Sequence, residues 1–226
     1  MIAVVTFYFY RFLPHDTGIE KEVPTQKVGY NLKAQLAVWK ERRILLIGII
    51  VLGMAFAEGS ANDWLPLTMV DGYGVDSLTG SYMYGLFVAA MTIGRFTGGF
   101  ILDKYGRVPV LKGSAVLAAI GIILVIWGQH YLIAGVGVVL WGLGASLGFP
   151  VGLSAAGDDP RGAAIRVGAV ATIGYIAFLV GPPGLGFLGE HVGLLHALIV
   201  VLIGVIVAGW ISGAAQPIGV KEKKSD

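Results

Sequence analysis

Residues 94–109, with the sequence GRFTGGFILDKYGRVP, decide the fold of this chain. They lie between two long apolar runs, so they mark the place where one membrane helix ends and the next begins. Gly106 can adopt a positive φ, which lets the chain reverse direction within a few residues. Asp103, Lys104 and Arg107 then lie where hydrocarbon gives way to water. An ordered acid–base–glycine–base series is more than a simple turn between two spans requires.

The composition is that of a membrane protein. Of the 226 residues, 56% are hydrophobic and only 13% are charged, with a mean hydropathy of +0.78. Soluble domains carry about 25% charged residues. The chain has no cysteine, no cluster of His or carboxylate residues at metal-ligand spacing and no phosphate-binding loop. We therefore expect no metal site, no cofactor, no nucleic-acid partner and no ATP-driven transport.

The apolar runs predict an all-α polytopic membrane domain over residues 44–214. Each run is long enough to cross a bilayer, which takes about 20 residues. The connections at 128–131 and 189–194 are very short, so the helices that they join are expected to be antiparallel neighbours. The six expected spans cover approximately residues 44–67, 81–102, 108–127, 132–154, 167–188 and 195–214.

Three further segments flank this domain. Residues 1–13 are apolar but too few to span, so they are either a short interfacial segment or, as we favour, the remnant of a preceding membrane helix. Residues 14–43 are polar and form a long loop, in which 33–43 could be a short amphipathic helix on the membrane surface. Residues 215–226 form a polar tail.

The basic residues predict the orientation. Segments 11–43, 104–112, 161–166 and 221–224 hold 15 of the 16 Lys and Arg residues, and the alternation of the spans puts all four segments on one side. The loops on the other side contain none. By the positive-inside rule, the long loop, the Asp103 loop and the C-terminal tail are expected to be cytoplasmic.

The series around Asp103 resembles the loop signature of the major facilitator superfamily of secondary transporters. That signature reads Gly, any residue, branched apolar, any residue, Asp, basic, any residue, Gly, basic, basic, and it joins the second and third helices of each six-helix half. It is met here by Gly99, Ile101, Asp103, Lys104, Gly106 and Arg107. The last basic position is Val108, which departs from the pattern.

The resemblance implies the C-terminal six-helix half of a twelve-helix transporter of the bacterial inner-membrane type. Such a half consists of two inverted three-helix repeats, which would be 44–127 and 132–214. The implied function is secondary active or facilitative transport of a small solute across the cell membrane. The implied partners are that solute, the lipid bilayer, and either the missing N-terminal half or a second copy. We expect no transport by the chain alone unless it pairs in one of these ways.

Glu58, Asn62 and Asp63 are candidate groups for a substrate or proton site. Counted at 1.5 Å per residue, Glu58 lies about 21 Å and Asp63 about 29 Å above the cytoplasmic end of the first span. An acid at the depth of Glu58 costs about 2.5 kcal/mol or more when it faces lipid, so it should face a cavity or a partner. Asn62 is four residues on, on the same helix face. The alternative is a helix-end acid hydrated from outside.

Arg95 is the only basic residue in the interior of a predicted span, because Lys112 lies at the start of the span 108–127 and belongs to the basic segment 104–112. Its depth differs from that of Glu58 by about 10 Å on the same count, so a direct pair is not expected, and Asp103, Asp158 or Asp159 is the better partner. The resemblance suggests a cytoplasmic gate built from Arg95, Gly99, Asp103, Lys104, Gly106 and Arg107. The alternative is an arginine that snorkels to the interface and only anchors its helix.

The resemblance also implies that the first and fourth helices line the substrate cavity, which makes Trp141 a candidate site residue. Packing in the core is the alternative for Trp141. The glycines Gly144, Gly148 and Gly152 are spaced by four on the same span, and small residues at this spacing are typical of close helix packing.

Two other functions are considered. A non-transporting membrane scaffold or a truncated gene product would share this composition. The series Gly144-Ala145-Ser146-Leu147-Gly148 also matches the nucleophile pattern of serine hydrolases, with His196 on the sixth span. Ser146 lies about 21 Å inward from the outer end of its span and His196 lies at the outer end of its own, whereas a base must come within about 3 Å of its nucleophile. We therefore expect no intramembrane protease, and no enzyme.

Overall fold

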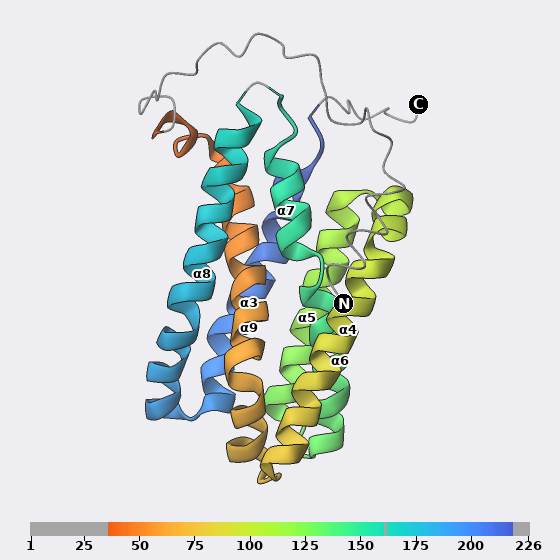
Figure 1. The fold of residues 1–226 in the computed structure, drawn as a ribbon, viewed down its shortest axis with the longest axis vertical. Coiled ribbons are helices and arrows are strands. Elements are labelled where there is room, and N and C mark those ends of the chain that lie inside the picture. The colour runs from red at the N-terminus through yellow and green to blue at the C-terminus, as the bar shows by residue number, and fades with distance from the viewer. Residues whose placement is uncertain (1–35, 161, 219–226) are drawn as a thin grey trace, which may run out of the picture. The chain divides into compact units, whose positions relative to one another are not determined.

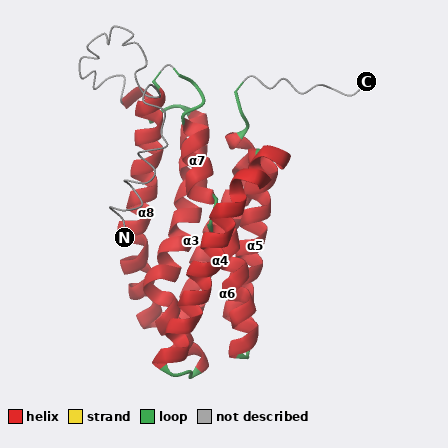
Figure 2. Ribbon diagram, turned by 45° about the vertical axis from the view of Figure 1, so that its right-hand side comes forward, coloured by secondary structure: helices red, strands yellow, loops and turns green. Residues whose placement is uncertain are grey.

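A computed structural model describes residues 36–160 and 162–218. The predicted helix remnant at 1–13, the loop as far as residue 35 and the tail beyond residue 218 lie outside the described residues. Within the described part the regular structure is helical throughout and contains no strand (Figure 2). The prediction of an all-α chain is confirmed.

Seven α-helices and one short 3₁₀ helix are described (Figure 1). They make six membrane spans, since α6 and α7 together form the fourth span and α9 with η1 forms the sixth. The elements are α3 (Arg42–Tyr73), α4 (Ser77–Tyr105), α5 (Arg107–Trp127), α6 (Tyr131–Ala145), α7 (Gly148–Ala156), α8 (Ala163–Val192), α9 (Leu194–Trp210) and η1 (Ile211–Ala215). The predicted number and order of spans are confirmed.

Several helices extend beyond the limits predicted from hydropathy. Helix α3 continues to Tyr73, where Gly74 takes a left-handed conformation (φ 65°) and its N–H bonds to the Val70 carbonyl. Helix α4 begins at Ser77, because the Asp76 side chain accepts a hydrogen bond from the Thr79 N–H. Apolar runs end where water begins, whereas helical hydrogen bonding ends at a cap, so the two limits differ.

The fourth span is interrupted between α6 and α7. Pro150 has no N–H, so the carbonyl of Ser146, four residues earlier, loses its usual helical donor. Residues 146 and 147 accordingly form a turn, and the helix resumes at Gly148. The break leaves a backbone acceptor without a helical donor in the middle of a membrane span.

The helix contacts follow a two-fold repeat. The first helix of each three-helix unit packs on the second helix of the other unit, as α3 does on α8 and α6 on α4. Likewise α3 packs on α9 and α6 on α5, and the third helices α5 and α9 pack on each other. This pattern is the one expected of the two predicted inverted repeats.

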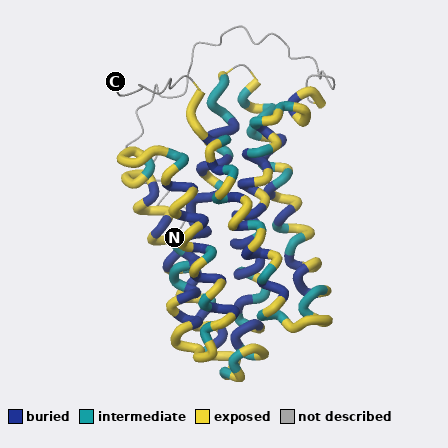
Figure 3. The backbone as a smooth tube through the Cα atoms, turned by 180° about the vertical axis from the view of Figure 1, so that it is seen from behind, coloured by how far each residue is buried: buried dark blue, intermediate teal, exposed yellow. Residues whose placement is uncertain are grey.

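Burial is distributed unevenly over the six spans. Helix α3 is the most buried of the spans, and α4 and α8 are among the least buried (Figure 3). Small residues permit the close contacts of the fourth span, but they do not line a single interface. A Cβ at Gly144 would meet the backbone of α5, whereas one at Gly148 or Gly152 would meet side chains of α3. The break at residues 146–147 explains this change of neighbour.

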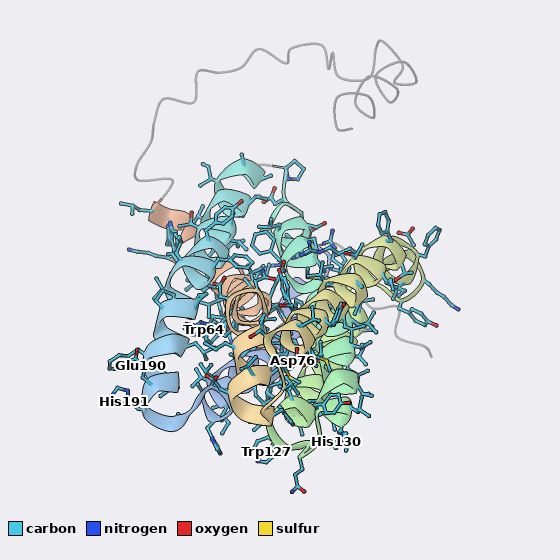
Figure 4. All side chains as sticks on the ribbon, turned by 60° about the horizontal axis from the view of Figure 1, so that its bottom comes forward. Trp64, Asp76, Trp127, His130, Glu190 and His191 are labelled. Carbon is cyan, nitrogen blue, oxygen red and sulfur yellow. The ribbon has the colours of Figure 1, made fainter. Side chains whose placement is uncertain are left out.

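One end of the bundle carries the basic residues and is called the basic end here. Helices α3 and α5 begin there with arginines, and α4 ends there with Lys104 and Tyr105. Figure 4 is turned toward the other end, where Trp127, His130 and His191 are labelled at the ends of their helices. Trp64 lies on α3, and its Nε1–H donates to the Pro182 carbonyl of α8 at 2.9 Å.

Candidate functional site

A pocket of about 950 Å³ runs along α4 and α7 to the basic end. Its inner part holds two charged side chains, those of Glu58 of α3 and Arg95 of α4. Most of its wall comes from α4, α7 and α8. The lining residues used below are Glu58, Arg95, Gly99, Asp103, Gly106, Arg107, Phe149, Tyr175 and Phe178.

Glu58 and Arg95 form a direct ion pair, contrary to the prediction. The Arg95 Nη2–H donates to Glu58 Oε1 at 2.8 Å. The depth count placed the two residues about 10 Å apart because it started from helix ends that were too close to the middle. Counted from Tyr73 of α3 and Ser77 of α4, they lie about 22 and 27 Å from the same end, a difference that a long arginine side chain spans.

Arg95 has a second partner on the interrupted span. Its Nε–H donates to the Ser146 carbonyl at 3.3 Å, and this is the carbonyl that Pro150 leaves without a helical donor. Arg95 therefore connects α3, α4 and the break between α6 and α7. The predicted pairing of Arg95 with Asp103, Asp158 or Asp159 is wrong, since Glu58 is its acidic partner.

The two members of the pair are exposed to different extents. The Glu58 side chain is 11% exposed, whereas that of Arg95 is 46% exposed. The guanidinium is thus the more accessible of the two charges. A carboxylate buried in this way within a span requires a counter-ion, and Arg95 provides it.

The other predicted substrate-site residues lie outside the pocket wall. Asn62 is partly buried, and its Oδ1 accepts a hydrogen bond from the Tyr84 hydroxyl at 3.3 Å. Asp63 is exposed, one residue further along α3. Trp141 is fully buried and packs edge-on against Phe87, with ring centroids 5.7 Å apart. Of the four predicted residues, only Glu58 contributes to the pocket surface.

The loop signature lies at the basic end of the pocket. Gly106 has φ 77° and ψ 171°, a conformation essentially restricted to glycine, and the predicted positive φ is confirmed. Gly99 and Asp103 line the pocket, and Asp103 forms no ion pair within the described residues. The Lys104 ammonium lies 5.1 Å from the centroid of the Tyr105 ring.

Arg107 of the signature belongs to an ionic cluster that sequence reasoning did not find. Its Nη1–H donates to Asp158 Oδ1 at 2.5 Å, and Arg43 of α3 donates to Asp158 Oδ2 at 2.8 Å. Burial raises the pKa of Asp158, but the hydrogen bonds and charges of Arg107 and Arg43 outweigh it, so the pKa lies below its ordinary value of 3.8. Arg43 also donates to the carbonyls of Ala155 and Gln216.

An aromatic wall completes the pocket. Phe149 of α7 lies between two aromatic residues of α8, with ring centroids 6.1 Å from Tyr175 and 6.0 Å from Phe178. Tyr175 is exposed, and the two phenylalanines are partly buried. Apolar residues are so frequent in membrane spans that the sequence holds no signal for this group. Only the break after α6, which turns Phe149 toward α8, brings the three rings together.

Comparison with known proteins matches this arrangement to a described family. The sequence model of the Major Facilitator Superfamily matches residues 1–182 and 52–224, in two overlapping alignments. The chain belongs to the major facilitator superfamily. Its repeat pattern and the loop signature between α4 and α5 are thus those of the superfamily, and it is a multi-pass membrane protein.

Relatives in the superfamily include proteins of three bacteria. An uncharacterized MFS-type transporter of Yersinia pestis is 35% identical over 156 residues, which cover 69% of this chain and 41% of that protein. An uncharacterized transporter of Sinorhizobium fredii is 31% identical over a region that covers 72% of this chain and 46% of that protein. The membrane protein MosC of Rhizobium meliloti is 30% identical over a region that covers 74% of this chain and 41% of that protein.

The fold is also found in a solved structure. The crystal structure of the transporter FucP in the outward conformation has a TM-score of 0.73 at 14% sequence identity. The match covers 81% of this chain and 45% of FucP. The matched part of this chain therefore corresponds to less than half the length of each of these four proteins.

Proposed function

We propose that this chain acts as one six-helix half of a secondary active or facilitative transporter of a small solute. The Glu58–Arg95 pair at the inner end of the pocket carries this proposal. Charged side chains within a membrane span are expensive and are typically retained for function, facing a cavity rather than lipid. Here both charges line a pocket large enough for a small solute.

The pocket supplies one wall of the substrate site. It is bounded by α4 and α8, which are among the least buried spans of the described chain. In transporters built from repeats, the substrate lies at the interface between the repeated bundles near the middle of the membrane. A second six-helix half, either a separate N-terminal half or another copy of this chain, would cover this wall.

The basic end is proposed to be cytoplasmic and to hold a gate. The positive-inside rule supports this orientation, because the basic residues cluster at this end. Asp158 connects the start of α3 to the start of α5 through Arg43 and Arg107, while Asp103 stays available at the mouth of the pocket. Ion pairs of this kind would form and break as the two halves move relative to each other.

Transport is tested by comparing uptake in cells that express the wild-type chain, Glu58→Gln, or the control Asp71→Asn. Asp71 is an exposed acid near the end of α3 remote from the basic end. Cells are incubated with a mixture of isotopically labelled small solutes, and the internal pools are measured by mass spectrometry. We expect loss of one labelled pool in Glu58→Gln at unchanged protein abundance, and a normal pool in the control.

A non-transporting scaffold predicts that all three cell lines have the same internal pools, and this result would refute the proposal. The requirement for a second half is tested separately. Uptake by proteoliposomes that contain only verified monomers of the chain would refute that part of the proposal.

A further inference from the structure

We propose that the substrate is a small organic anion with an apolar, ring-sized body, whose acidic group binds the free edge of the Arg95 guanidinium. This inference rests on the proposed function, since it concerns the same pocket. It goes further by assigning the chemical class of the solute and a specificity-determining residue.

The inner end of the pocket presents a positive charge. Nearly half of the Arg95 side chain is exposed, while Glu58 is almost covered. A guanidinium stays protonated at every physiological pH, so this positive charge is permanent. Glu58 Oε1 is already occupied by Arg95. The accessible charge at the inner end of the pocket is therefore positive.

Several hydrogen-bond donors of Arg95 remain available to a solute. A guanidinium has five N–H donors in a planar fork. The described contacts of Arg95 use Nε, toward the Ser146 carbonyl, and one N–H of Nη2, toward Glu58. Both N–H groups of Nη1 and the second N–H of Nη2 have no hydrogen-bond partner among the described residues, and one N–H from each nitrogen makes up the outer edge of the guanidinium. Two parallel N–H groups on one edge match the two oxygens of a carboxylate, which makes the pair strong and directional.

The other charged residues of the pocket lie at its basic end. Asp103 lies eight residues further along α4, about 12 Å from Arg95 toward the basic end. Arg107 is held by Asp158 at the basic end. Asp103 is too far from Arg95 to compete with a solute anion for its guanidinium, and Arg107 is already paired at the basic end. Glu58 is the one carboxylate that contacts Arg95 among the described residues. The charge of the solute is therefore matched by Arg95 and not by the residues at the mouth.

The aromatic wall offers a surface for an apolar body. Phe149, Tyr175 and Phe178 line the same pocket as Arg95. Their rings offer faces and edges to which an aromatic or aliphatic body can pack, at a gain beyond simple burial. A solute with an acidic group at one end and a ring at the other satisfies both parts of the pocket.

The test uses three probes that share one ring and differ in charge: benzoate, benzyl alcohol and benzylammonium. Their binding to the purified full chain in lipid nanodiscs is measured by isothermal titration calorimetry. We expect wild type to prefer benzoate, and Arg95→Gln to bind benzoate about tenfold more weakly, as loss of a charge-assisted hydrogen bond implies. Lys112→Gln removes one positive charge from an exposed position outside the pocket and should leave benzoate binding unchanged.

Two further variants separate binding from folding. Arg95→Lys keeps the charge but lacks the planar fork, so it should fold and still bind benzoate more weakly than wild type. Glu58→Gln removes the competing carboxylate, so benzoate affinity should be equal to or higher than that of wild type. Preference for benzylammonium with loss in Glu58→Gln, equal binding of all three probes, or no binding of benzoate would each overturn the inference.

This experiment does not depend on flux. Arg95-dependent binding of benzoate without uptake of any labelled solute would support the anion site and refute the transport proposal. Uptake of a neutral or cationic solute that depends on Glu58, together with no preference for benzoate, would do the reverse.

Discussion

Removal of Arg95 should destabilise the chain more than removal of Glu58. Arg95→Gln leaves a carboxylate that is 11% exposed without its counter-ion, whereas Glu58→Gln leaves a guanidinium that is 46% exposed and reaches the pocket. Removing one partner of a fully buried pair costs about 3–5 kcal/mol. We expect about 3 kcal/mol for Arg95→Gln. We expect about 1 kcal/mol for Glu58→Gln, because the remaining charge is partly hydrated and glutamine still accepts a hydrogen bond.

The measurement is a double-mutant cycle on the purified chain in mixed micelles. Unfolding is followed by the fluorescence of the five tryptophans during titration with sodium dodecyl sulfate. The variant with both substitutions should cost less than the sum of the single variants, by about 1–2 kcal/mol, because neither charge then remains unpaired. Equal costs for the two single substitutions, or strict additivity, would refute this account of the pair.

Asp158→Asn should lower the free energy of unfolding by about 2 kcal/mol relative to the exposed control Asp71→Asn. In the folded state the pKa of Asp158 lies below its ordinary value of 3.8. The stabilisation by its carboxylate is therefore fully present above pH 3.8 and is lost as the pH falls through the lowered pKa, so the difference in unfolding free energy between wild type and Asp158→Asn should shrink in that range. Gly106→Ala should cost about 1–3 kcal/mol in the same assay because its backbone conformation is nearly restricted to glycine. Gly148→Ala should cost a similar amount, about 1–3 kcal/mol, because the added methyl group overlaps a side chain of α3. Gly113→Ala, where the added methyl group meets open space, is the control for both glycine variants. Equal effects at the three glycines would contradict both the conformational argument for Gly106 and the packing argument for Gly148.

The number and order of the spans could be predicted because the physical cause is local. A run of about 20 apolar residues forms a spanning helix whatever its neighbours are. The turn at Gly106 was predictable for the same reason, since the need for a positive φ is a property of one residue and its adjacent peptides.

The ion pair was not predictable, because it depends on small errors that accumulate along two helices. The expected ends of α3 and α4 differ from the observed ones by six and four residues, or about 9 and 6 Å. Counted from the observed ends, the depths of Glu58 and Arg95 differ by only about 5 Å, which an arginine side chain spans. The Asp158 cluster was missed for a related reason, because it joins Arg43, Arg107 and Asp158 from three separate segments whose proximity follows only from the tertiary packing.

Trp141 illustrates another limit of sequence reasoning. Its helix was expected to line the cavity, and the broken span does so through residues 147–154. Trp141 itself precedes the break and points into the core beside Phe87. Hydrophobic side chains carry no mark that separates a core position from a cavity position within one helix, so the direction in which each faces depends on where the helix is interrupted.

Because both α4 and the broken fourth span serve the Ser146 carbonyl, the effect of a mutation in one depends on the residue in the other. Arg95 supplies the hydrogen bond that Pro150 withholds, so the residue at position 95 compensates for the residue at position 150. Replacing Pro150 by alanine restores an N–H to that carbonyl. Growth defects of Arg95 variants should then be partly relieved by second-site mutations at position 150, and a selection for suppressors would recover these mutations without any knowledge of the solute.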